Sequence, residues 1–174
     1  MQTTATMKRI STVALAVLLS LAIVCAGSVP YAAAATSPST AVSKVKSAYG
    51  SSYPLSSSNK ITTAKKNVFG SYNKVLGVNL KNVKSYTAYK KSNSKYQYVC
   101  FVCKAKSKAK VSTIKKQLKK YVSSETSSNK NYYNAKGKKL MSKAKVGSKG
   151  TYCYLFILDT SGNSKAVKAF KKAV

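Results

Sequence analysis

Enzymes need side chains that exchange protons, attack electrophiles or hold metals, and this chain has few of them. It contains no histidine, and its only carboxylate side chains are Glu125 and Asp159. Without histidine, a Ser-His-Asp or Cys-His site cannot form. Two carboxylates can hydrolyse glycosides, but Asp159 opens an Asp-Thr-Ser-Gly turn and Glu125 is most simply a surface charge. We therefore expect a non-enzymatic protein, and an enzyme of unrecognised type remains an alternative.

Metal-binding and nucleophile motifs are equally weak. Zinc sites need clusters of cysteine and histidine, and calcium needs several oxygen ligands, so we expect no metal and no cofactor. Ser-x-x-Lys can activate a serine, but the pattern occurs eight times, as expected by chance in a chain rich in both residues. The eight matches begin at Ser43, Ser57, Ser71, Ser92, Ser107, Ser112, Ser127 and Ser142.

Three cysteines follow the N-terminal segment, and their spacing suggests how they are oriented. Cys100 and Cys103 form a C-x-x-C motif inside an apolar stretch with the composition of a strand. Residues three apart on a strand point to opposite faces, so these two should not bond to each other. Cys153, in a second apolar stretch, could form a disulfide with Cys100 or Cys103 in an oxidising compartment. Alternatively, all three are small buried apolar residues.

Lysine dominates the charged residues. The chain has 32 basic residues against 2 acidic ones, and every basic residue after position 35 is lysine. Lysine carries a point charge and lacks the planar guanidinium group with which arginine forms paired hydrogen bonds to phosphates and guanines. Nucleic acid is therefore an unlikely partner. We expect an anionic wall polymer, an acidic glycan or an anionic lipid surface, unless the lysine excess is only compositional. The candidate polyanion-binding residues are Lys115, Lys116, Lys119, Lys120, Lys138, Lys139, Lys171 and Lys172.

Tyrosine is the second abundant residue with a possible binding role. The chain has 13 tyrosines and no tryptophan. Tyr132 and Tyr133 are adjacent in a polar segment and could stack on a ligand, as aromatic rings do in glycan-binding surfaces. Tyrosine is also a good strand residue with a polar tip, so most of these rings should instead pack in the core.

The first 35 residues have the pattern of a secretory signal peptide. Lys8 and Arg9 precede an apolar run over residues 13–26, and four alanines at 32–35 form a small-residue cleavage site. An uncleaved anchor is the alternative, because the apolar run approaches the length that spans a bilayer. A lipid anchor at Cys25 is unlikely because bulky Val24 precedes it. The predicted location is therefore secreted or cell-surface associated.

The rest of the chain has the pattern of a single small α+β domain. Residues 36–40 are expected to be a short flexible leader, and residues 41–174 a lysine-rich domain. About 139 residues are enough to bury one core. We predict an antiparallel or mixed sheet of about four strands with helices packed on it. The expected helices lie at 42–49, 61–69, 109–122 and 163–173, with a loop at 123–134. One expected hairpin has strands at 83–90 and 96–105, of which the second should be central in the sheet because it is apolar on both faces. The other has strands at about 140–146 and 151–158.

Several short motifs occur in an order that resembles the bacterial domain-of-unknown-function family 4358, over about residues 42–172. The resemblance implies an exported or lipid-anchored protein with no catalytic residues to transfer. The chain departs from that family in charge, since typical members are rich in Asp and Glu. The motifs are Ala48-Tyr49-Gly50, Tyr53-Pro54, Phe69-Gly70, Val102 to Lys106 leading into a helix, and Lys149 to Tyr152 entering a strand.

Together these features predict a secreted, non-enzymatic binding module that associates electrostatically with anionic cell-surface polymers. The alternative is a membrane-active cationic protein of the antimicrobial type. Both are compatible with the charge, since a surface with this excess of lysine attracts any extended polyanion or anionic bilayer.

Overall fold

The structure is a computed structural model, and it describes residues 36–62 and 73–174. Thr36–Val174 forms one compact unit. The predicted signal peptide at 1–35, with Cys25, lies outside the described residues, as does most of the helix expected at 61–69. Among the described helices, none is long and apolar enough to cross a bilayer.

A four-stranded antiparallel sheet forms the centre of this unit, in the order β3-β4-β6-β5. Two hairpins build it, and the central strands β4 and β6 are the most apolar, as is usual for strands covered on both faces. This confirms the α+β class and the central position predicted for the second strand of the first hairpin. The strands are β3 (Val83–Ser92), β4 (Gln97–Ala105), β5 (Lys145–Lys149) and β6 (Tyr152–Ile157).

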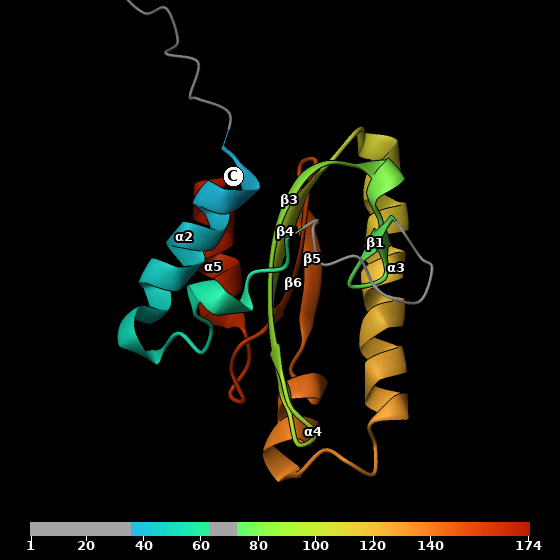
Figure 1. Ribbon diagram of the computed structural model, residues 1–174. Helices are drawn as coiled ribbons and strands as arrows, with labels where there is room; N and C mark the ends of the chain where they lie inside the picture. The colour runs from blue at the N-terminus through green and yellow to red at the C-terminus, as the bar shows by residue number, and fades with distance from the viewer. Residues whose placement is uncertain (1–35, 63–72) are drawn as a thin grey trace, which may run out of the picture. The chain divides into compact units, whose positions relative to one another are not determined.

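Helices cover both faces of the sheet (Figure 1). Helices α2 (Pro38–Tyr49) and α5 (Ser164–Ala173) pack together on one face. On the other face lie α3 (Lys108–Ser128) and α4 (Ala135–Ser142). A small two-stranded sheet, β1 (Lys74–Val75) and β2 (Val78–Asn79), packs beside α3, and short 3₁₀ turns occupy Gly50–Ser52, Ser57–Asn59 and Leu80–Asn82.

Side chains of the central strands alternate between two buried clusters. On β4, Phe101 and Cys103 point to the α3 face, whereas Cys100 and Val102 point to the face covered by α2 and α5. All four side chains are fully buried. The two faces therefore have separate cores joined only through the sheet, which fixes the side of the molecule on which each surface lysine lies.

The expected flexible leader at 36–40 is wrong, because α2 begins at Pro38. The side chain of Ser37 accepts a hydrogen bond from the Thr40 backbone N–H at 3.1 Å, which caps the helix. Proline suits the first helical position because its missing N–H would have no partner there. The Ser-Pro-Ser-Thr sequence is thus a helix start rather than a linker.

Helix α3 extends beyond the predicted 109–122, so much of the loop expected at 123–134 is helical. The serine- and threonine-rich composition of 123–128 suggests a loop, because these residues compete with helical hydrogen bonds. Here Thr126 bonds the Val122 carbonyl at 2.8 Å, and Asn129 ends the helix by donating its N–H and its amide to the Glu125 carbonyl. The residues at 123–128 are mostly exposed, so these local hydrogen bonds, rather than tertiary packing, accompany the extension of the helix.

The strand predicted at 140–146 is also wrong in its first half, which belongs to helix α4. Asn134 caps this helix by accepting from the Gly137 N–H at 2.9 Å. Leu140 and Met141 then lie on its buried face. A short apolar pair reads equally well as strand or helix, and the Asn134 cap decides for the helix. Strand β5 therefore begins only at Lys145.

Candidate functional site

The eight lysines predicted to bind polyanions do not form one patch. Lys115, Lys116, Lys119 and Lys120 lie on α3, and Lys138 and Lys139 lie on α4, on the same side of the sheet. Lys171 and Lys172 lie on α5, on the opposite side. The eight lysines therefore lie on two faces of the sheet, and their binding of polyanions stays a prediction.

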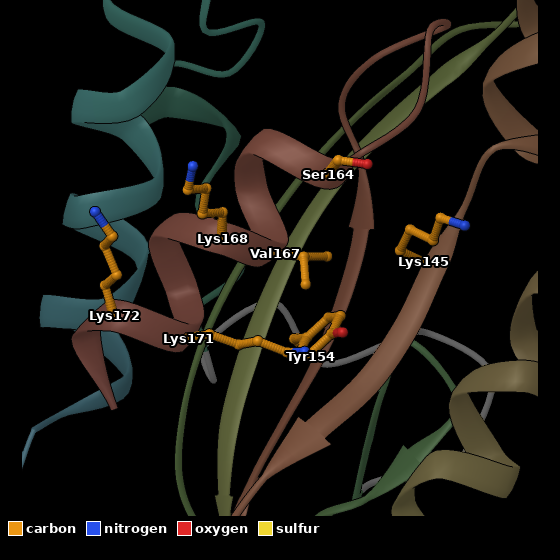
Figure 2. A pocket seen from close by; sticks show the side chains of 7 residues that line it. All are labelled: Lys145, Tyr154, Ser164, Val167, Lys168, Lys171 and Lys172. Carbon is orange, nitrogen blue, oxygen red and sulfur yellow. The ribbon is translucent and has the colours of Figure 1, made fainter.

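The lysines of α5 belong to a groove of about 550 Å³ between this helix and the edge strand β5 (Figure 2). We call it the β5–α5 groove. Tyr154 of β6 and Val167 supply its apolar floor, and lysines from both flanking elements form its rim. Its lining residues are Lys145, Tyr154, Ser164, Val167, Lys168, Lys171 and Lys172.

Local hydrogen bonds hold α5 in this position. Asp159 forms the predicted turn, accepting from the backbone N–H of Ser161 at 2.8 Å. The fully buried Asn163 accepts from the Leu158 N–H and donates to the Lys143 carbonyl, both at 2.8 Å, which ties the start of the helix to β6 and to the segment before β5. Ala166 and Phe170 then anchor the buried face of the helix on the sheet.

A charged contact links the C-terminal end of α5 to strand β5. The ammonium group of Lys149, at the end of β5, donates to the backbone carbonyl of Lys171 at 2.5 Å. A cation at the C-terminus of a helix is favoured by the free carbonyls there. Lys149, which is not among the lining residues of the groove, thus links β5 to α5.

Tyr154 occupies its place on the floor because its neighbour across the sheet is glycine. Gly147 of β5 pairs with Tyr154, and a Cβ atom on Gly147 would collide with the tyrosine hydroxyl. The ring stacks on Phe156 with centroids 4.8 Å apart and tilts against Phe170 at 4.7 Å. The ring is therefore fixed in one orientation by its packing.

The Tyr154 hydroxyl is the notable polar group of the groove. The residue is only 7% exposed, yet its hydroxyl makes no hydrogen bond to another described residue. Burial raises the pKa of this phenol above its ordinary value of 10.0, so it keeps its proton further into the alkaline range than a free tyrosine does. The hydroxyl reaches the surface of the groove, where a ligand oxygen or water can accept its hydrogen bond, whereas the buried hydroxyls without a partner among the described residues are those of Tyr49 and Tyr53.

No carboxylate neutralises the groove. In the part of the chain that the structure describes, the one contact between a lysine and a carboxylate joins Lys90 Nζ to Glu125 Oε2, at 3.8 Å, on the α3 side. Glu125 is therefore a surface charge beside lysine, as predicted. The other carboxylate, Asp159, is engaged with the backbone and hydroxyl of Ser161. The lysines beside α5 face solvent without an acidic partner.

The cysteines follow the predicted geometry. Cys100 and Cys103 point to opposite faces, and Cys153 lies opposite Cys103 in the register of β4 and β6. Of the two predicted disulfides, only Cys103–Cys153 fits this register, and it remains a prediction because the three thiols are free. Burial raises the pKa of Cys100 to about 12, which disfavours its thiolate.

Tyr132 and Tyr133, the two tyrosines predicted to stack on a ligand, differ in exposure. Tyr132 is 70% exposed, but Tyr133 is 6% exposed and belongs to the core beside α3. Tyr133 therefore cannot stack on a ligand, and that part of the prediction is wrong. The polar sequence around the pair gave no sign that the chain turns one ring inward.

Within the described residues, no group of three cysteine or acidic side chains is placed to hold a metal.

Sequence reasoning missed Lys145, Lys168 and Tyr154. Lys168 lies one turn from Lys171 and Lys172 and could have been found from the helical spacing of α5. Lys145 was predicted to lie near the end of a strand at 140–146, whereas in the structure it is the first residue of β5. Tyr154 looked like one more core residue of a central strand, and only the pairing with Gly147 distinguishes it.

A comparison with protein families matches residues 56–158 to the model of the domain of unknown function DUF4358. The match includes all four strands of the main sheet, with Gly147 and Tyr154, and it ends before α5 begins at Ser164. No curated protein and no solved structure matches the chain. The family match covers more than half of the chain and agrees with the resemblance seen in the sequence. The chain therefore belongs to the DUF4358 family.

Proposed function

We propose that this protein is an exported, non-enzymatic module that binds anionic polymers of the cell surface by electrostatic attraction. The observation that carries the proposal is the lack of neutralisation on its surface. Thirty lysines follow position 35, and only Lys90 has a carboxylate within 4 Å among the described residues. Such a surface attracts polyanions over a distance set by the salt concentration.

The lysines are placed at a cost to the fold. On α3, Lys115 with Lys119 and Lys116 with Lys120 are one turn apart, and like charges at this spacing destabilise a helix by roughly 0.2–0.5 kcal/mol per pair. A bound polyanion would offset this repulsion. Binding to the folded state should then raise the thermal stability of the protein.

The packing of α5 favours a polymer ligand over insertion into a bilayer. A helix that enters a membrane interface must turn its apolar face outward. In α5 this face is formed by Ala166 and Phe170, which are fully buried against the sheet. Exposing them would require the helix to leave the domain. We therefore place the membrane-active alternative second.

The test is co-sedimentation of the purified protein with isolated bacterial cell envelopes over a salt series. We expect retention at low salt and release as the Debye length falls from about 10 Å at 0.1 M to about 3 Å at 1 M. Envelopes stripped of their anionic polymers are the control and should retain little protein. Equal retention on stripped envelopes, or leakage of dye from anionic vesicles at the same protein concentration, would overturn the proposal.

A further inference from the structure

Two rows of lysines border the β5–α5 groove. Lys145 and Lys149 lie on the same face of β5, and at 3.3–3.4 Å per residue they are roughly 13 Å apart. Lys168, Lys171 and Lys172 lie along α5 on the other side. Of the β5 row, only Lys145 lines the groove itself, and Lys149 donates to the Lys171 carbonyl, which links the ends of the two rows.

The ammonium groups of these rows do not converge on one point. Figure 2 shows Lys171 reaching toward Tyr154, whereas the ends of Lys145, Lys168 and Lys172 point away from that ring. A pocket for one small anion would gather its cations around a single centre. A row of diverging cations instead matches a ligand that carries several negative charges in sequence.

The floor supplies a donor that a uniform lysine surface lacks. The Tyr154 ring is held in place by stacking on Phe156, by a tilted contact with Phe170 and by the space left at Gly147, and its hydroxyl has no partner among the described residues. Ser164, at the first turn of α5, adds a second hydroxyl to the lining. These groups can donate to an anionic oxygen that lies in the groove.

We propose that the β5–α5 groove holds one strand of a linear polyanion, lying along α5, with one of its acidic oxygens bonded to the Tyr154 hydroxyl. Successive anionic groups contact the lysines on both sides. The inference rests on the proposed function and assigns its site and the form of its ligand. From Ser164 to Lys172 the helix rises about 12 Å, so a single phosphate cannot span the groove.

The experiment measures the affinity of the full-length protein for inorganic phosphate, tripolyphosphate and long-chain polyphosphate at fixed salt. We expect affinity to rise steeply up to a chain that spans the groove. Poly-glutamate, as a linear polycarboxylate, distinguishes phosphate from carboxylate as the charged group. Equal affinity for inorganic phosphate and the long chain, compared per molecule, would overturn the linear-ligand inference.

Matched variants locate the site. The groove variant Lys168→Gln/Lys171→Gln/Lys172→Gln and the α3 variant Lys116→Gln/Lys119→Gln/Lys120→Gln each remove three exposed charges. We expect the groove variant to lose at least about 10-fold more affinity than the α3 variant, and its salt slope to fall by about one for each lost contact. Melting curves verify that both are folded.

Tyr154→Phe tests the hydroxyl separately, because the ring and its stacking are kept. A hydrogen bond to a charged group corresponds to an affinity loss of about 10-fold. An unchanged affinity in Tyr154→Phe, or equal losses in the two lysine variants, would overturn the assignment of the site while leaving the proposed function intact. Failure of the wild-type protein to bind any polyanion would overturn both.

Discussion

The outer face of α3 and the β5–α5 groove both carry closely spaced lysines, but they differ in what surrounds the charges. On α3 the ammonium groups project from a single exposed helix face, and the apolar side chains Ile114 and Leu118 point away from them into the core. In the groove, lysines from two elements border a concave surface with the Tyr154 hydroxyl at its floor. The first surface can attract a polyanion, while the second can also orient one.

This difference teaches that charge density alone does not define a site on such a protein. Diffuse attraction depends on the total charge and on salt, and it is similar wherever lysines are exposed. Specific binding needs shape and donors fixed in place before the ligand arrives. If the groove behaved like α3 in every measurement, the lysine pattern would have no specific site.

The largest expected effect follows from removing the ring that anchors α5. Phe170 is fully buried against Tyr154 and Phe156, and truncation of such a ring costs about 3–5 kcal/mol of unfolding free energy. Leu118→Ala, under α3, should cost about 2–5 kcal/mol. Urea unfolding measures both. Folded Phe170→Ala should also bind long polyphosphate more weakly than folded Leu118→Ala does.

Phe170→Leu is the milder control, since it keeps an apolar side chain in the same position and its fold should survive where Phe170→Ala does not. A Phe170 variant that unfolds less readily than Leu118→Ala and retains full polyphosphate affinity would mean that α5 is not needed for the groove. The contrast between the two faces would then fail.

A second effect comes from filling the space beside Tyr154. In Gly147→Ala the new methyl group would collide with the Tyr154 hydroxyl and lie 2.5 Å from Cζ, so the ring must move. Overpacking of this kind costs typically about 1–3 kcal/mol. The variant should unfold at lower urea concentration and bind polyphosphate more weakly.

Ser148→Ala is the matched control on β5, because alternate residues of a strand point to opposite faces and Ser148 lies away from the groove. It should preserve both stability and binding. If Gly147→Ala had no more effect than Ser148→Ala, then the glycine would have no role in positioning the tyrosine.

A third prediction concerns alkaline pH and the core beside α3. Burial, with a smaller contribution from Glu125, raises the pKa of Tyr133 to about 12 from 10.0. Between these values the unfolded chain releases the phenol proton while the folded chain keeps it, so unfolding becomes more favourable as pH rises. This contribution is complete below pH 10 and is lost as pH passes about 12.

Tyr133→Phe removes this ionisation, so the unfolding free energy of the wild type should fall relative to that of the variant across that interval. Urea unfolding at closely spaced pH values measures it, and because both proteins share the same lysines, their titration cancels. A difference that stays constant from pH 9 to 12.5 would contradict the buried position of the phenol.

The smallest effect is expected on α3 itself. Lys116→Glu replaces the repulsion with Lys120 by an attractive pair one turn apart, with the acidic residue on the N-terminal side. We expect the unfolding free energy to increase by about 0.5 kcal/mol, measured in urea at low salt. The gain should disappear in 1 M salt because the pair is exposed and screened. A persistent gain at high salt would point to a cause other than charge.

Patterns along the chain predicted the sheet well. The alternation at 83–90 and the apolar stretch at 96–105 predicted β3 and β4, because a strand covered on one face alternates and a strand covered on both faces is a continuous apolar run. The same rules failed at 140–146, where a short apolar pair fits either structure, and at 123–128, where a helix of poor propensity continues with side-chain hydrogen bonds to its backbone. Such errors arise where caps and local side-chain hydrogen bonds decide.

The candidate site was less predictable than the fold. Helical spacing shows that Lys171 and Lys172 are exposed, but it cannot tell which face of the sheet α5 covers. Lys145 and Tyr154 come together with them only through the register of β5 and β6 and the position of Gly147. Contacts between residues far apart in the chain define the groove, and local patterns do not encode them.

The most direct test of the central claim is the salt dependence of polyphosphate binding by the wild-type protein. The logarithm of the association constant should fall linearly with the logarithm of salt concentration, with a slope set by the number of lysines that contact the ligand. A steep negative slope is the predicted result. Binding that is tight but independent of salt, or no binding at the lowest salt, would contradict the account.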